Sequence, residues 1–259
     1  MSTSVLPPLP DNAWFRCLQP RPGARLRLIC LPHAGGGLSL FHGWRKELLP
    51  DIELWAVLLP GRESRLHEPP ISEMSRLIPA LAANIPAGLL AHPYALFGTS
   101  LGGLIAFELA RKLAREQRPQ PAFLLPAATR PPHLPNPEPP IRHLPDDAFL
   151  AALAGRYARI PPEVQAHAEL LALLLPMLRA DLALYETYTF RPDTPPLATP
   201  IIAVAGQQDA LVDPQTLGLW AAHTTAGFTQ QLLPAGHFFA SEQPELLRPV
   251  LAQATNRWA

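Results

Sequence analysis

A serine flanked by glycines, between a strand pattern and a helix pattern, most constrains how this chain can fold. An apolar segment from Tyr94 leads into Gly98 to Gly102 (GTSLG), and a helical pattern then continues to Arg115. A serine at such a turn adopts a strained backbone conformation, and the glycines on either side remove Cβ atoms that would clash. The turn exposes the Ser100 hydroxyl at a helix N-terminus, where backbone N–H groups can stabilise an oxyanion. The motif therefore indicates a nucleophilic serine.

Strand and helix patterns alternate along most of the chain. Apolar segments predict strands at 26–31, 52–58, 94–98, 122–127, 200–206 and 228–233. Helices are expected to begin near Ser39, Ser72, Leu101, Asp213 and Glu245. This alternation predicts an α/β fold, in which helices cover both faces of a mostly parallel central sheet. A length of 259 residues suits one such domain with an insertion.

A different pattern fills residues 130–189, which are first proline-rich and then helical only. We expect Asp146 to cap the first helix, a second helical segment to begin near Pro162, and Pro176 to interrupt or restart it. The apolar residues of this segment suit either buried core helices or a lid that lines an acyl pocket. The expected organisation is a flexible leader over 1–12, a core over 13–129 and 190–259, and a helical lid insertion over 130–189.

Two residues further along the chain complete a catalytic pattern with the serine. A serine nucleophile needs a base, usually a histidine that a carboxylate holds in the right tautomer. In doubly wound hydrolase sheets these residues occur in the order Ser, Asp, His, each after a strand. Ser100, Asp209 and His237 each follow a predicted strand in this order. We therefore predict that these three residues form a catalytic triad.

Other residues compete for the roles of acid and base. Asp213 precedes Pro214 and has an alternative role as the cap of the next helix, so Asp209 is favoured as the acid. His223 is expected within that helix. His33 lies in a glycine-rich loop, and as the base it would break the residue order of this fold. We expect His33 to pack beside the site.

An oxyanion hole needs two backbone N–H groups. One is expected from Leu101, directly after the serine. The other is expected from the loop at 32–37, which follows the first predicted strand, with Ala34 favoured and Gly35 as the alternative. The loss of one such donor typically lowers the rate ~100–1000-fold.

Composition and charge exclude several classes of function. The 21 Lys and Arg residues balance the 21 Asp and Glu residues, so there is no overall charge that would favour nucleic acid or an anionic membrane. Cys17 and Cys30 do not make a disulfide framework. The first ten residues do not resemble a signal peptide, and no apolar run has the length of a membrane span. We therefore expect a cytoplasmic protein that binds neither nucleic acid nor membranes. The sequence does not indicate an oligomeric state, and a monomer is the default expectation.

Five short motifs occur in a fixed order over nearly the whole chain past the leader. They are PHAGG at 32–36, LPGRE at 59–63, GTSLG at 98–102, LPMLRAD at 175–181 and GHFF at 236–239. Together they resemble the type II thioesterases, which are stand-alone α/β-hydrolases that accompany nonribosomal peptide and polyketide synthases. One departure is Thr99, because the family usually has histidine immediately before the nucleophile.

The resemblance implies an editing enzyme that hydrolyses acyl thioesters from the phosphopantetheine arm of carrier proteins. It implies the α/β-hydrolase fold with a helical lid between the sixth and seventh strands, and a triad of Ser100, Asp209 and His237. No metal or organic cofactor is expected, since the phosphopantetheine belongs to the substrate. The expected partner is an acyl or peptidyl carrier protein that docks transiently.

Further site residues are expected around this triad. Substrate-binding roles are expected for His33, Gly35, Met177 and Phe238. Arg62 and Arg65, on a loop near the mouth of the site, are candidate contacts for an acidic carrier.

Two other functions remain open at this point. One is a carboxylesterase or lipase that acts on free oxyesters with the same triad. The other is a non-catalytic carrier-docking protein on a hydrolase scaffold, against which the complete triad argues. Comparison of thioester and oxyester substrates distinguishes the first, and a Ser100→Ala variant distinguishes the second.

Overall fold

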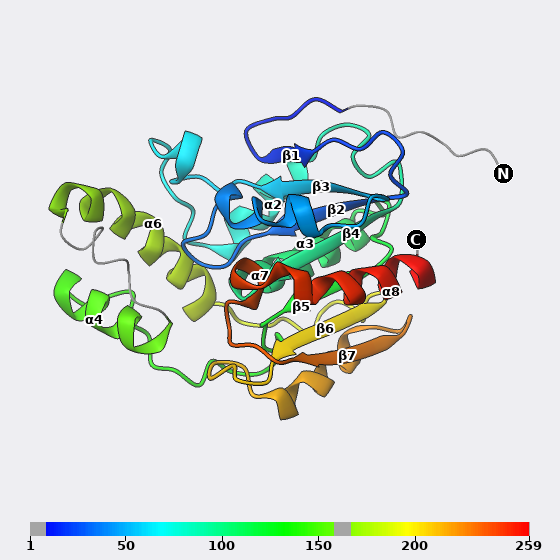
Figure 1. Ribbon diagram of the computed structural model, residues 1–259. Helices are drawn as coiled ribbons and strands as arrows, with labels where there is room; N and C mark the ends of the chain where they lie inside the picture. The colour runs from blue at the N-terminus through cyan, green and yellow to red at the C-terminus, as the bar shows by residue number, and fades with distance from the viewer. Residues whose placement is uncertain (1–8, 158–166, 259) are drawn as a thin grey trace.

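The computed structural model describes residues 9–157 and 167–258, in which a seven-stranded sheet carries helices on both faces (Figure 1). The strands are β1 (Phe15–Gln19), β2 (Leu26–Leu31), β3 (Ile52–Val57), β4 (Tyr94–Thr99), β5 (Leu124–Ala127), β6 (Ile201–Gly206) and β7 (Phe228–Leu233). Their order in the sheet is β1-β3-β2-β4-β5-β6-β7. Only the β1–β3 pair is antiparallel, so the mostly parallel sheet expected from the sequence is confirmed.

The inner strands are buried along their whole length. Every residue of β2, β3, β4, β5 and β6 is buried, which explains why these segments are continuous apolar runs in the sequence. Their side chains point alternately into two cores, one on each face of the sheet. Each fully buried Leu, Ile or Phe side chain contributes about 1.5–3 kcal/mol relative to an exposed one.

Different helices close the two cores. On one face, α2 (Met74–Ala83) and α3 (Leu101–Arg115) contribute residues such as Leu77 and Ile105. On the other face, α1 (Trp44–Glu47), α7 (Phe239–Glu242) and α8 (Arg248–Trp258) contribute residues such as Trp44 and Leu251. This double covering is the arrangement that the alternating pattern predicted.

The edge strand β1 was not expected from the sequence. It pairs with β3, with Phe15 opposite Val57, and of the five residues of β1 only Phe15 is buried. The helix expected near Ser39 is also different, because the chain there forms a 3₁₀ turn, Leu38–Phe41, and then the short helix α1.

Two later segments differ from a regular α-helix. The segment Pro214–His223 is a 3₁₀ helix, capped as expected by Asp213, whose side chain accepts a hydrogen bond from the Gln215 N–H at 2.9 Å. The closing helix begins later than expected, because a 3₁₀ turn, Pro244–Leu247, precedes α8.

The inserted segment holds α4 (Asp146–Arg156) and α6 (Ala168–Glu186), which lie to one side of the sheet in Figure 1. They follow the fifth strand and precede the sixth, so the expected place between the sixth and seventh strands is wrong for this sheet. Asp146 is the first helical residue, after Pro145 as the cap, and its carboxylate pairs with Arg179 at 2.5 Å. The helix start expected near Pro162 falls outside the described residues.

Pro176 does not interrupt α6. The helix continues through it, although the proline removes one hydrogen bond of the helix. Buried side chains on both sides of the proline, Leu175 and Leu182, pack with Phe149 of α4 and hold the helix together. Packing therefore outweighs the local cost of the proline.

The described residues contain no helix with both the length and the apolar character that a membrane span requires. Cys17 and Cys30 are free thiols, and burial raises the pKa of the Cys30 thiol well above its usual value.

Candidate active site

Ser100 connects β4 to α3 in a strained conformation, with φ +54° and ψ −119°. The surrounding chain approaches so closely that two neighbouring positions admit only glycine. A Cβ atom at Gly98 would collide with the carbonyl of Gly102, and one at Gly102 would collide with the carbonyl of Leu31. The sequence thus forces the serine into a tight turn and places its hydroxyl at the N-terminus of α3.

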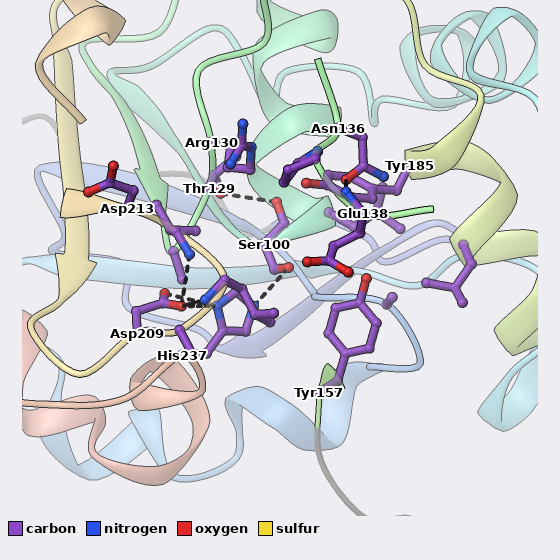
Figure 2. Close-up of a pocket in the computed structure, with 18 residues that line it drawn as sticks. Ser100, Thr129, Arg130, Asn136, Glu138, Tyr157, Tyr185, Asp209, Asp213 and His237 are labelled. Atoms are coloured by element: carbon purple, nitrogen blue, oxygen red, sulfur yellow. Dashed lines mark hydrogen bonds and ion pairs between the residues drawn. The ribbon is translucent and has the colours of Figure 1, made fainter. Parts of the chain in front are cut away.

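Ser100, His237 and Asp209 form a continuous chain of hydrogen bonds (Figure 2). His237 Nε2 lies 3.1 Å from Ser100 Oγ, and His237 Nδ1 lies 3.0 and 2.9 Å from Asp209 Oδ1 and Oδ2. An ionised carboxylate only accepts hydrogen bonds, so Nδ1 carries the hydrogen. Nε2 is then the acceptor that faces the serine hydroxyl.

Asp209 is fixed by its own loop. Its side chain is fully buried, and Oδ1 also accepts the N–H groups of Leu211 and Val212 at 2.8 and 3.1 Å. The rival carboxylate, Asp213, caps the next helix and points away from His237 in Figure 2. The structure therefore places Asp209, and not Asp213, against the histidine.

Two backbone N–H groups beside Ser100 are available to a ligand. Within the described residues, neither the Ala34 N–H nor the Leu101 N–H donates a hydrogen bond, and both residues line the cavity at Ser100. The Gly35 N–H donates to Asp181 Oδ2 at 2.7 Å and is therefore occupied. Of the two loop residues considered from the sequence, Ala34 is the one with a free donor.

His33 and Phe238 support the site without lining the cavity. His33 Nδ1 lies 2.8 Å from the Ala34 carbonyl oxygen, which only accepts, so Nδ1 carries the hydrogen. Burial lowers the pKa of His33, although the hydrogen bond to Ala34 opposes this effect. Phe238 stands edge-on to both His33 and His237, with ring centroids 5.3 and 5.0 Å apart. This row of rings restricts the position of the His237 imidazole.

The cavity at Ser100 has a volume of about 200 Å³ and a mixed lining. The inserted segment contributes much of its wall, with Glu138, Tyr157, Leu182 and Tyr185. Burial raises the pKa of Tyr157 to about 12, so its hydroxyl stays protonated and can donate. These residues were not predicted, because they follow no strand and belong to no recognisable motif.

The inserted segment thus forms a small apolar core of its own and also lines the cavity. Leu175 of α6 is buried against α4, Tyr185 lines the cavity, and Leu182 does both. Met177 is buried, and neither it nor Gly35 is among the residues that line the cavity. Among the described residues, no group of three His, Cys, Asp or Glu side chains is placed to hold a metal ion.

Arg62 and Arg65 are not surface residues. Arg62 is 4% exposed and its guanidinium pairs with Asp181, with Nη2 and Oδ1 2.7 Å apart. Arg65 is 6% exposed, donates to the Leu58 carbonyl at 2.8 Å and stacks over Trp14. The expectation that these arginines contact a carrier is therefore wrong, because both side chains hold the protein's own loops.

Comparison with known proteins adds independent observations. A family model described as "Thioesterase domain" matches residues 26–253. The gramicidin S biosynthesis protein GrsT of Aneurinibacillus migulanus is 35% identical over 231 residues, which cover 89% of each chain. The thioesterase PikA5 of Streptomyces venezuelae is 35% identical over 233 residues, which cover 90% of this chain and 82% of that protein. The solved structure of YbtT, a type II thioesterase from the yersiniabactin pathway, superimposes with a TM-score of 0.86 at 30% identity, over 95% of this chain and 100% of that one.

The sheet topology and the serine at its strand-to-helix turn define an α/β-hydrolase. Within that class, the match over residues 26–253 shows that the chain belongs to the thioesterase domain family, whose members hydrolyse thioesters.

Proposed function

We propose that this protein is a stand-alone editing thioesterase that removes acyl groups from the phosphopantetheine arm of carrier proteins. The observation that carries the proposal is the hydrogen-bonded series Ser100, His237 and Asp209 at a cavity with two free N–H donors. The carrier-bound substrate is supported by the relatives, since YbtT is a type II thioesterase from a nonribosomal peptide and polyketide pathway.

In the first half-reaction, His237 Nε2 accepts the proton of Ser100 Oγ as this oxygen attacks the thioester carbonyl carbon. The carbonyl oxygen becomes an oxyanion, which the N–H groups of Leu101 and Ala34 stabilise, with the N-terminus of α3 adding a favourable dipole. The carbon–sulfur bond then breaks, and the imidazolium returns its proton to the departing sulfur. A thiol with a pKa of ~8.5 needs less assistance than an alcohol.

In the second half-reaction, water takes the place of the departed thiol. His237 removes a proton from the water as it attacks the acyl-enzyme carbonyl, and the oxyanion forms again at the same donors. Collapse of this intermediate releases the carboxylic acid and returns the proton to Ser100 Oγ. This scheme requires no metal and no cofactor of the protein's own.

Asp209 acts through His237. Its buried carboxylate stabilises the imidazolium that forms in both half-reactions and keeps the hydrogen on Nδ1. The backbone N–H groups of Leu211 and Val212 hold the carboxylate in place, so the histidine does not have to reorient during the reaction.

The proposal is tested with one acyl group presented in three forms: on carrier protein, on coenzyme A and as a free oxyester. We expect the carrier-bound thioester to have the highest kcat/KM. A clear preference for the oxyester would instead favour the carboxylesterase or lipase function. A Ser100→Ala variant should lose both hydrolysis and covalent labelling by a fluorophosphonate, and hydrolysis that survives this change would refute the proposed nucleophile.

A further inference from the structure

Helix α6 contacts the loop that supplies the Ala34 N–H through one buried carboxylate. Asp181, in the second half of α6, is 1% exposed. Its Oδ2 accepts the N–H of Gly35 at 2.7 Å, although the two residues are 146 positions apart in the sequence. A charged group this deeply buried is costly unless it is paired and hydrogen-bonded, so its position is well defined.

Arg62 completes the arrangement from a third segment, the loop after β3. Its Nη2 donates to Asp181 Oδ1 at 2.7 Å and its Nη1 donates to Asp181 Oδ2 at 2.9 Å. The two side chains thus form a bidentate ion pair, which is a strong form of this interaction. Nη1 also donates to the carbonyl of Gly36 at 2.8 Å. The ion pair therefore holds two successive residues of the loop, Gly35 by its N–H and Gly36 by its carbonyl.

The peptide group between Ala34 and Gly35 is consequently held at both ends. Its N–H donates to Asp181, and its carbonyl accepts from His33 Nδ1 at 2.8 Å. Gly35 has φ +77°, and an added Cβ there would lie 2.8 Å from Leu178 of α6, so the helix also packs closely on the loop. A fixed peptide group at this position restricts the rotation of Ala34, and with it the direction of the Ala34 N–H.

We propose that Asp181, together with Arg62, is a positioning residue for the oxyanion hole, and that α6 sets the geometry of that hole through this ion pair. This inference rests on the proposed function in one respect, the role of the Ala34 N–H as an oxyanion donor. The same helix contributes Leu182 and Tyr185 to the wall of the cavity. One element thus shapes the space for the acyl group and positions a group that stabilises the transition state.

The test uses a double variant that keeps the site filled but removes the acceptor for the Gly35 N–H. Replacement of a buried ion pair by apolar residues of similar size is often neutral for stability, so Arg62→Met combined with Asp181→Leu is expected to fold. A single Asp181→Asn variant, checked by its melting temperature, gives a second measurement if the double variant does not fold.

Two measurements test the proposal. One determines kcat and KM separately, and the other compares the binding of two inhibitors. An acyl trifluoromethyl ketone adds to Ser100 and forms an oxyanion, whereas an acyl thioether of the same chain length cannot. For the double variant we expect kcat to fall ~100-fold with KM changed less than about threefold, because a displaced donor acts in the transition state. Ketone binding should weaken by a similar factor, and thioether binding should stay the same.

Glu186→Gln is the matched control on the same helix. Glu186 is also a buried carboxylate that accepts backbone N–H groups, from Ile141 and Arg142, and it pairs with the Arg142 side chain. None of these partners belongs to the oxyanion loop, the segment 32–37 that supplies the Ala34 N–H. We expect this variant to lose stability without a change in ketone binding.

Three results would overturn the proposal. The first is a folded double variant that keeps the full wild-type kcat. The second is a double variant that binds the ketone and the thioether more weakly by the same factor. The third is a Glu186→Gln variant that loses as much ketone binding as the Asp181 variants. Failure of the proposed function is recognised separately. It would appear as a wild-type preference for oxyesters over carrier thioesters, with the difference in ketone binding between wild type and double variant unchanged.

Discussion

Asp209 meets His237 with both carboxylate oxygens, each about 3 Å from Nδ1, while Oδ1 also accepts two backbone N–H groups. Among the described residues, the hydrogen-bond partners of this side chain are the imidazole and two backbone N–H groups, and all three donate. An amide in its place would turn its NH₂ group either toward the backbone N–H groups or toward the imidazole. In the second case, it would favour the imidazole tautomer with the hydrogen on Nε2, which cannot accept the serine proton.

Asp209→Asn is therefore expected to lower kcat/KM by ~10⁴ while the protein stays folded. The measurement is steady-state hydrolysis of an acyl thioester, together with a thermal melt. The control is Asp213→Ala, which removes a helix cap and is expected to cost about 1 kcal/mol of stability with less than a tenfold loss of kcat/KM. A larger catalytic loss at Asp213 than at Asp209 would reverse the assignment of the acid.

The close approach of the chain around the serine gives a second prediction. Gly102→Ala should greatly reduce the yield of folded protein, because the new Cβ would collide with the Leu31 carbonyl. Gly155→Ala, in α4, is the matched control, since nothing lies within 4 Å of a Cβ there. We expect this change to stabilise the protein by about 0.5 kcal/mol, the usual gain from alanine in a helix. The yield of soluble folded protein checks Gly102→Ala, and the free energy of unfolding in urea checks Gly155→Ala.

Much of the fold follows from the sequence, because its inner strands are buried on both faces and read as apolar runs. The edge strand β1 lacks this signal, since of its five residues only Phe15 is buried. The continuity of α6 through Pro176 could not be predicted either. The sequence shows that Pro176 removes a helix hydrogen bond. It does not show that the buried contacts of Leu175 and Leu182 offset this loss, because those contacts depend on residues distant in the chain.

The sequence also located the three hydrogen-bonded residues, because each follows a strand in a fixed order. It could not indicate that Arg62 is buried, since an arginine in a polar loop looks the same whether it faces solvent or an internal carboxylate. Its partner, Asp181, lies 119 positions away. The cavity residues Glu138 and Tyr185 were missed for the same reason, since only the folded chain brings them to Ser100.

A third prediction concerns pH and lies away from the serine. His223 is 6% exposed, and its Nε2 is 2.7 Å from His133 Nδ1. Burial, followed by the charges of His133 and Arg111, lowers the pKa of His223 to about 4. Between pH 6.5 and about 4, His223 is therefore protonated in the unfolded chain but neutral in the folded protein. The free energy of unfolding consequently falls as the pH decreases through this window.

The His223→Phe variant isolates this contribution, because phenylalanine suits the aromatic surroundings and does not titrate. From pH 7 to pH 4.5, the wild type should lose about 2 kcal/mol more stability than the variant does. Urea unfolding at four pH values gives the comparison. Parallel stability curves for the two proteins would show that His223 already binds its proton in the folded state.

The size of the cavity predicts a preference for short acyl groups. Its volume of about 200 Å³ lies below the ~300–1,000 Å³ that is usual for drug-sized ligands, and its wall carries Glu138 and two tyrosines. We expect kcat/KM on a common carrier to fall at least tenfold from butanoyl to dodecanoyl. Tyr185→Ala should reduce this difference by enlarging the space, and higher activity of the wild type on dodecanoyl would contradict the prediction.

The order of the strands has a consequence for the newly made protein. The proposed nucleophile follows β4, whereas the proposed acid and base follow β6 and β7, which leave the ribosome later. A nascent chain that reaches only to the end of α6 holds Ser100 and the oxyanion loop but has neither Asp209 nor His237. Synthesis proceeds from the N-terminus, so the chain cannot cleave a thioester by this mechanism until β7 and the loop after it have emerged. If the proposed triad carries the reaction, the order of synthesis therefore sets when activity can begin.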